Sequence, residues 1–124
     1  MPADKIGRQS SKDAGEAAER AAEKFLRARD MVCVERNYRC RLGEIDLIMQ
    51  DGAALVFVEV RMRKNGGFGG AAASIGRAKQ RRIIAAAQHY LSGLRALPAC
   101  RFDAVLLNDL NASGIEWIRD AFGT

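Results

Sequence analysis

The segment from Gly43 to Arg61, GEIDLIMQDGAALVFVEVR, constrains the fold more than any other part of the chain. It consists of two apolar runs joined at Asp51-Gly52. Asp-Gly between runs rich in β-forming residues predicts a tight hairpin, because both central residues of a type I′ turn need a positive φ. A two-residue turn at this position predicts three pairs: Gln50 with Ala53, Asp46 with Phe57, and Glu44 with Glu59.

The two faces of this hairpin differ in polarity, because successive side chains of a strand point to opposite faces. One face is entirely apolar: Ile45, Leu47, Met49, Ala54, Val56, Val58 and Val60. The other is apolar near the turn and charged at the far end: Ile48, Leu55, Phe57, Glu44, Asp46, Glu59 and Arg61. This pattern predicts two central strands covered on both faces. Asp46 and Glu59 become diagonal neighbours, roughly 7–8 Å apart at Cα, and ionised carboxylates at the end of a buried sheet require a compensating cation.

The rest of the chain predicts an α/β domain with the order α-β-β-β-α-β-β and a mixed sheet flanked by helices. The other expected elements are a helix from Lys12 or Asp13 to Arg29, a strand over 31–38, a helix from an N-cap at Ser74 to about Leu94, and strands over 101–107 and 115–119. We predict a flexible tail over residues 1–12 and a single domain over residues 13–124. The buried face of the second helix should contain Ile75, Ile83, Ala86, Ala87, Tyr90 and Leu94.

The composition of the chain indicates where in the cell the protein is located and what kind of molecule it binds. The chain has no apolar run near the ~20 residues that cross a bilayer and no secretory apolar region at its start, so we expect a cytoplasmic protein without a membrane partner. Cys33, Cys40 and Cys100 are scattered, which favours buried, reduced thiols. The single histidine, His89, lies in a helical pattern, which speaks against histidine-based metal sites. The net charge of +5, together with the segment from Arg61 to Arg82 that has basic but no acidic residues, favours a polyanionic partner.

Several charged side chains have two interpretations. Glu19 lies at the border of the apolar stripe of the first helix, so it either reaches over the sheet edge or is a solvated helix carboxylate. Lys79 lies on the apolar face of the second helix and either points to the carboxylates or extends to solvent. Arg77 and Arg81 point outward, as a binding surface or a solvated face. Phe68, in the glycine-rich loop over residues 62–73, is either a loop anchor or a ring that stacks on a base.

The charged end of the hairpin suggests metal-assisted phosphodiester hydrolysis. Mg²⁺ or Mn²⁺ prefers hard oxygen ligands, and one or two carboxylates with water and phosphate oxygens are sufficient. Asp46 and Glu59 supply such ligands and Arg61 supplies a nearby cation, while Glu19 and Lys79 can add one ligand and one cation. Alternatively these groups form a structural ion-pair network, and Glu44 belongs either to the site or to that network.

Asp46 stands thirteen residues before Glu59-Val60-Arg61, a spacing that resembles the PD-(D/E)xK nuclease signature of archaeal Holliday-junction resolvases. The segments GEIDLI, VFVEVR and FGGAAAS, followed by Lys79-Gln80, closely resemble the YraN-type family of uncharacterised bacterial proteins. That resemblance covers residues 14–122 and implies a restriction-endonuclease-like fold with nuclease ancestry. It places the metal ligands at Glu19, Asp46 and Glu59 and puts Arg61 at the usual lysine position.

The resemblance implies a Mg²⁺- or Mn²⁺-dependent endonuclease that acts on DNA, branched or containing single strands, and by analogy a homodimer. Nucleic-acid contacts are expected from Arg63, Lys64, Arg77, Lys79 and Arg81. Arg61 departs from the signature, because a guanidinium stabilises charge but cannot accept a proton. Turnover is therefore slow or absent unless Lys79 substitutes. The alternatives are a nucleic-acid-binding module without turnover and an adaptor whose basic face meets an acidic partner.

Overall fold

The computed structural model describes residues 3–62, 75–108 and 114–123, with side chains from residue 15 onward. The elements in this part of the chain are α1 (Ala3–Arg27), β1 (Val32–Cys40), β2 (Gly43–Asp51), β3 (Ala54–Met62), α3 (Arg77–Leu91), β4 (Cys100–Leu107) and β5 (Ile115–Phe122). Within these described residues, the predicted order of helices and strands is confirmed. Ser74, Phe68 and the basic residues Arg63 and Lys64 lie outside the described residues.

The five strands form one sheet in the order β1-β2-β3-β4-β5. Only β3 and β4 run parallel; the other neighbouring pairs are antiparallel. The mixed sheet of an α/β protein is therefore confirmed. No helix among the described residues combines the length and the apolar character that a membrane span requires.

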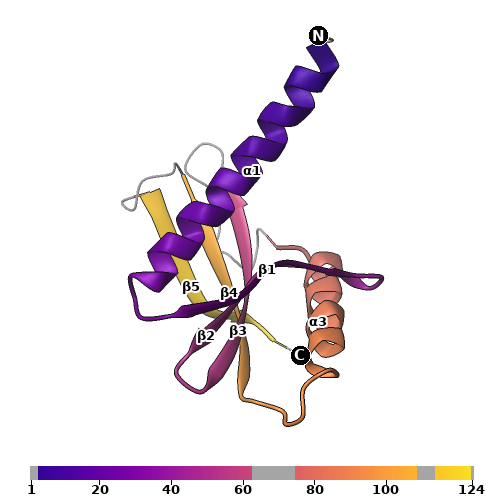
Figure 1. Cartoon of the computed structure of the whole chain (residues 1–124), viewed down its shortest axis with the longest axis vertical. Coiled ribbons are helices and arrows are strands. Elements are labelled where there is room, and N and C mark those ends of the chain that lie inside the picture. The colour runs from indigo at the N-terminus through magenta and orange to yellow at the C-terminus, as the bar shows by residue number, and fades with distance from the viewer. Residues whose placement is uncertain (1–2, 63–74, 109–113, 124) are drawn as a thin grey trace.

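The two helices cover opposite faces of the sheet (Figure 1). Under α1, the buried cluster contains Ala18, Ala22, Leu26, Leu47, Met49, Val56, Val58, Val105 and Leu107. Under α3, it contains Ile45, Ile48, Leu55, Phe57, Ile83, Ala86, Ala87, Ala104 and Leu106. The central strands β2 and β3 contribute to both clusters, as expected for strands covered on both sides.

The helix ends differ from the predicted ones. The first helix begins at Ala3 instead of Lys12 or Asp13, and its N-terminal turns project beyond the sheet (Figure 1). The flexibility predicted for residues 1–12 stays a prediction. The second helix is capped by Gly76 rather than Ser74, without a side-chain cap. It ends at Leu91, and Leu94, expected in the core, is exposed beyond the C-cap at Ser92.

The register predicted for the β2–β3 hairpin is wrong by two residues. Asp51 pairs with Ala54, so the turn is Gly52-Ala53, with only Gly52 at a positive φ of 60°. Phe57 faces Ile48 rather than Asp46. Asp51 remains in the ladder, where its carboxylate accepts a hydrogen bond from Arg101 at 2.9 Å. This tertiary contact outweighs the local preference of Asp-Gly for the turn.

The side-chain alternation of β2 breaks at Asp46. Leu47 packs under α1, whereas Ile45, two residues earlier, packs under α3. The prediction that both lie on one face is therefore wrong. Their partners on β1 are Arg36 and Tyr38, and Asn37 between them has φ of 52°. Asparagine adopts this left-handed backbone conformation more readily than most residues do. The conformation turns β1 and β2 together at this point.

Gly43 holds β2 against α3, because a methyl group at this position would overlap the carbonyl oxygen of Arg82. We expect Gly43→Ala to force the helix away from the strand and to lower the free energy of unfolding by about 1–3 kcal/mol, the usual cost of overpacking. Urea denaturation measures this. The control is Gly15→Ala in exposed α1, where a Cβ meets nothing within 4 Å and alanine should stabilise by about 0.5–1 kcal/mol. Equal effects of the two substitutions would contradict the assignment.

Candidate active site

The central sheet forks at one end. The β2–β3 ladder ends at the pair Leu47 and Val58. Beyond it β2 continues beside β1 as far as Gly43, and β3 continues beside β4 as far as Met62. Asp46 and Glu59 are the first residues past the last shared pair, so the fork places one carboxylate on each arm.

Asp46, half-buried on β2, is fixed by the backbone of the opposite arm. The Val60 amide donates a hydrogen bond to Asp46 Oδ2 at 2.8 Å. This bond spans the fork and holds the Asp46 side chain toward β3. The Asp46 side chain also shares hydrogen bonds with the carboxyl groups of Glu19 and Glu59, which keeps the three acidic groups close together.

Glu59 is buried on β3 and only 5% exposed. Two cations approach Glu59 Oε2: Arg61 Nε at 3.3 Å and Lys79 Nζ at 3.9 Å. Burial, and secondly the charge of Asp46, raise the pKa of Glu59 to about 7, although Lys79 and Arg61 act in the opposite direction. The negative charge of the two carboxylates is therefore only partly compensated by the protein's own cations.

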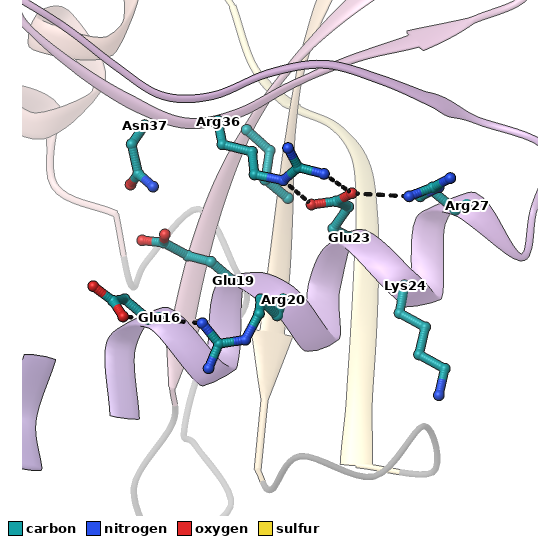
Figure 2. Close-up of a pocket in the computed structure, with 9 residues that line it drawn as sticks. Glu16, Glu19, Arg20, Glu23, Lys24, Arg27, Arg36 and Asn37 are labelled. Carbon is teal, nitrogen blue, oxygen red and sulfur yellow. Dashed lines mark hydrogen bonds and ion pairs between the residues drawn. The ribbon is translucent and has the colours of Figure 1, made fainter. Parts of the chain in front are cut away.

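Glu19 approaches the fork from α1. Its side chain is half-buried and points toward Asn37, the left-handed residue of β1 (Figure 2). Burial and the charge of Asp46 raise the pKa of Glu19, whereas a hydrogen bond with Asn37 lowers it. Of the two interpretations of Glu19, the reach over the sheet edge agrees with this geometry.

The predicted ligands are neighbours rather than a closed metal cage. Within the described part of the chain, no three His, Cys, Asp or Glu side chains are grouped tightly enough to hold a metal ion. Glu44 pairs instead with Arg39 at 3.3 Å on the surface. The chemistry of Asp46, Glu59 and Glu19 suits a hard cation, because all three offer carboxylate oxygens and the pKa values of both glutamates are raised by burial and, secondly, by the charge of Asp46.

The predicted basic residues separate into two groups. Lys79 points inward to Glu59, so of its two interpretations the structure agrees with the one in which it points to the carboxylates. Arg77 and Arg81 are exposed on α3. The three cysteines are free but only partly buried, and Cys100 is exposed, so the expectation of buried thiols is wrong.

Sequence reasoning missed the fork itself and the role of Asn37, because both depend on where a ladder ends. One signal was present: asparagine inside a β pattern often marks a left-handed residue. It also missed the buried Glu23 of α1, which Arg36 and Arg27 hold by hydrogen bonds.

The raised pKa of Glu59 makes stability depend on pH. Below pH 4.5 both folded and unfolded chains bind the proton; between pH 4.5 and about 7 only the folded chain keeps it, so stability falls as pH rises through this window. The rise in the pKa of Glu59 from 4.5 to about 7 corresponds to a change of about 3 kcal/mol in the free energy of unfolding. Glu59→Gln should therefore stabilise the metal-free protein by about that amount at pH 8 and little at pH 4.5. Urea denaturation in chelator at both pH values measures it; a variant less stable than the native protein at pH 8 would contradict the burial argument.

Fold and site together define an α/β domain with a carboxylate pair at a fork of its central sheet and basic residues beside it. The chain belongs to the uncharacterised protein family UPF0102, whose family model matches residues 18–107. That span contains Glu19, Asp46, Glu59, Arg61 and Lys79.

Similar proteins are known in several bacteria. A UPF0102 protein of Nitrosospira multiformis is 61% identical over 108 residues, which cover 87% of this chain and 91% of the relative. A UPF0102 protein of Methylobacillus flagellatus is 55% identical over 111 residues, 90% of this chain and 97% of the relative. One of Janthinobacterium sp. is 50% identical over 121 residues, 98% and 96% of the two chains.

Proposed function

We propose that this protein is a metal-dependent endonuclease of the PD-(D/E)xK type that acts on DNA, with a restriction-endonuclease-like fold. The observation that carries the proposal is the approach of Asp46 and Glu59 across the fork of β2 and β3. Nucleases of this signature draw an Asp and a Glu from two adjoining strands, and the mixed sheet with a helix on each face agrees with their architecture.

The residues at the fork fit Mg²⁺ or Mn²⁺. Asp46 and Glu59 supply two hard ligands, and Glu19 supplies a third carboxylate from α1 or holds a water ligand. A bound divalent cation would lower the pKa of an attacking water and neutralise charge on the phosphate. The pKa of Glu59, raised by burial and Asp46, indicates a site in which additional positive charge is favourable.

The cations beside Glu59 have different roles in this proposal. Arg61 is permanently charged and stabilises negative charge on the phosphate, but it cannot take a proton from water. Lys79 reaches the same carboxylate oxygen from α3 and can orient the nucleophile, so it substitutes for the lysine that the signature has at the position of Arg61.

DNA would be held by the exposed Arg77 and Arg81 of α3, together with Arg63 and Lys64. A homodimer would supply the two active sites that cleavage of both strands requires. The free cysteines support a reducing, cytoplasmic compartment.

Lys79→Met is expected to lower the cleavage rate about 100-fold, the scale of a lost transition-state cation. Arg61→Lys should stay within about threefold of the native rate. Arg81→Met, the matched control on the exposed side of α3, should weaken DNA binding in a salt-dependent way without lowering the rate at saturating DNA. Single-turnover kinetics with Mn²⁺ separates these effects. A large gain from Arg61→Lys together with a neutral Lys79→Met would show that Lys79 does not substitute.

The experiment that tests the proposal is incubation of forked, four-way, single-stranded and linear DNA with the native protein in Mn²⁺ and Mg²⁺, beside Asp46→Asn. Cleavage by the native protein alone supports the nuclease. Salt-sensitive DNA binding without cleavage in either metal favours the second candidate, a nucleic-acid-binding module that has lost turnover, for which Arg61 at the lysine position is the specific observation. Neither binding nor cleavage would contradict both.

A further inference from the structure

A groove of about 580 Å³, lined mostly by charged residues, lies between α1 and β1, beside the fork. Four basic side chains line it, namely Arg20, Lys24, Arg27 and Arg36, together with Glu16, Glu19 and Glu23. Figure 2 shows Glu23 at its centre, with Arg36 reaching it from β1 and Arg27 from the next turn of α1.

Glu23 is an anchor for these two arginines. Its side chain is only 8% exposed, yet Arg36 and Arg27 remain 58% and 61% exposed. Arg36 binds it with two nitrogens, and Arg27 Nη1 donates to Oε2 at 3.3 Å. These bonds lower the pKa of Glu23, so the carboxylate stays charged and keeps both guanidinium groups in place.

Two guanidinium groups that share one buried carboxylate leave a net positive charge and unused N–H donors facing solvent. Arg side chains fixed in this way bind phosphate with little further loss of side-chain entropy, because the planar donor group is already oriented.

The groove also leads to the candidate active site. Glu19 lines it one helical turn before Glu23, and its carboxylate lies near Asp46. A chain of phosphates that reaches the fork from this side would therefore pass Arg36 and Arg27 first.

We propose that the groove binds the backbone of one unpaired DNA strand and that Arg27 and Arg36 contact a phosphate adjoining the one that is cleaved. This inference rests on the proposed function and narrows its substrate to DNA with a single-stranded segment. The groove has the volume of a small-molecule pocket, which holds a short piece of one strand but not a duplex.

The test measures binding in the absence of metal, so it does not depend on cleavage. Fluorescence anisotropy is recorded with a labelled single-stranded oligonucleotide and its duplex, in chelator, at several salt concentrations. We expect the native protein to prefer the single strand. Arg27→Ala should weaken single-strand binding about tenfold and lower the slope of log K against log salt by about 0.7, the value for one phosphate contact.

Two further variants distinguish loss of the proposed phosphate contact from misfolding and from a general loss of positive charge. Glu23→Gln combined with Arg36→Gln replaces the ion pair by a neutral hydrogen-bonded pair and should weaken binding as Arg27→Ala does, with an unchanged circular dichroism spectrum. Arg95→Ala removes one exposed charge beyond α3 and should leave affinity and slope nearly unchanged. If Arg27→Ala matches Arg95→Ala, or if the duplex binds as tightly as the single strand, the inference is overturned, while the nuclease proposal stands or falls by the cleavage assay alone.

Discussion

Asp46→Asn and Glu59→Gln should each lower Mn²⁺-dependent cleavage of DNA at least about 1,000-fold. Each substitution keeps the shape of the side chain and removes a ligand charge on one arm of the fork. A single fixed electrostatic group is worth about 10²–10³ in rate, and loss of the metal adds to that. Single-turnover assays at saturating DNA measure the effect on the chemical step.

The control for both substitutions is Glu44→Gln, which changes a carboxylate two residues from Asp46. Glu44 pairs with Arg39 on the surface and should be dispensable, with a rate within about twofold of the native one. Unfolding cannot explain the loss in Glu59→Gln, which we expect to be more stable than the native protein at pH 8. An effect of Glu44→Gln as large as that of Asp46→Asn would show that the fork is not the catalytic centre.

Asp103→Ala should destabilise the protein by about 3–5 kcal/mol, the cost of leaving a buried ion pair without one partner. Asp103 is fully buried on β4. It accepts hydrogen bonds from Arg101 at 3.0 Å, from Trp117 Nε1 at 2.9 Å and from the Asp120 amide at 2.9 Å. Alanine would leave the Trp117 and Asp120 donors without this acceptor and Arg101 with Asp51 alone.

Urea denaturation measures this loss, with two comparison variants. Asp103→Asn keeps an acceptor oxygen and should cost less than alanine. Glu16→Ala removes a carboxylate whose ion pair with Arg20 is long and exposed, and it should change stability by less than about 0.5 kcal/mol. If Asp103→Ala and Glu16→Ala cost the same, the buried network does not hold β4 and β5 together as described.

The element order could be predicted because apolar periodicity and turn residues are local properties of the sequence. The alternation of Leu47, Met49, Val56 and Val58 placed them on one face, where α1 covers them. Parity predicted that Asp46 and Glu59 lie together, and they are neighbours, but the side-chain alternation of β2 breaks at Asp46, so their proximity follows from the fork of β2 and β3.

What could not be predicted depends on contacts between distant segments. Asp51 stays in the ladder because Arg101, fifty residues later, binds it. Ile45 and Leu47 lie on opposite faces because Asn37 turns the neighbouring strand. The sequence contains each of these residues, but no local rule pairs them.

The burial of Glu23, in the groove between α1 and β1, could not be predicted for the same reason. Its position in the helical pattern, away from the apolar stripe of Ala18, Ala22 and Leu26, indicates an exposed carboxylate, yet Glu23 is buried. Its burial requires Arg36 of β1, whose approach to α1 follows from the sheet topology.

The central claim is that Asp46 and Glu59 hold a metal ion. The most direct test is to measure Mn²⁺ binding by titration calorimetry for the native protein, Asp46→Asn and Glu59→Gln. The account predicts that the native protein binds Mn²⁺ and that each variant loses at least about tenfold in affinity, since each removes one charged ligand. Equal Mn²⁺ binding by all three proteins would show that Asp46 and Glu59 do not hold the metal and would contradict the account.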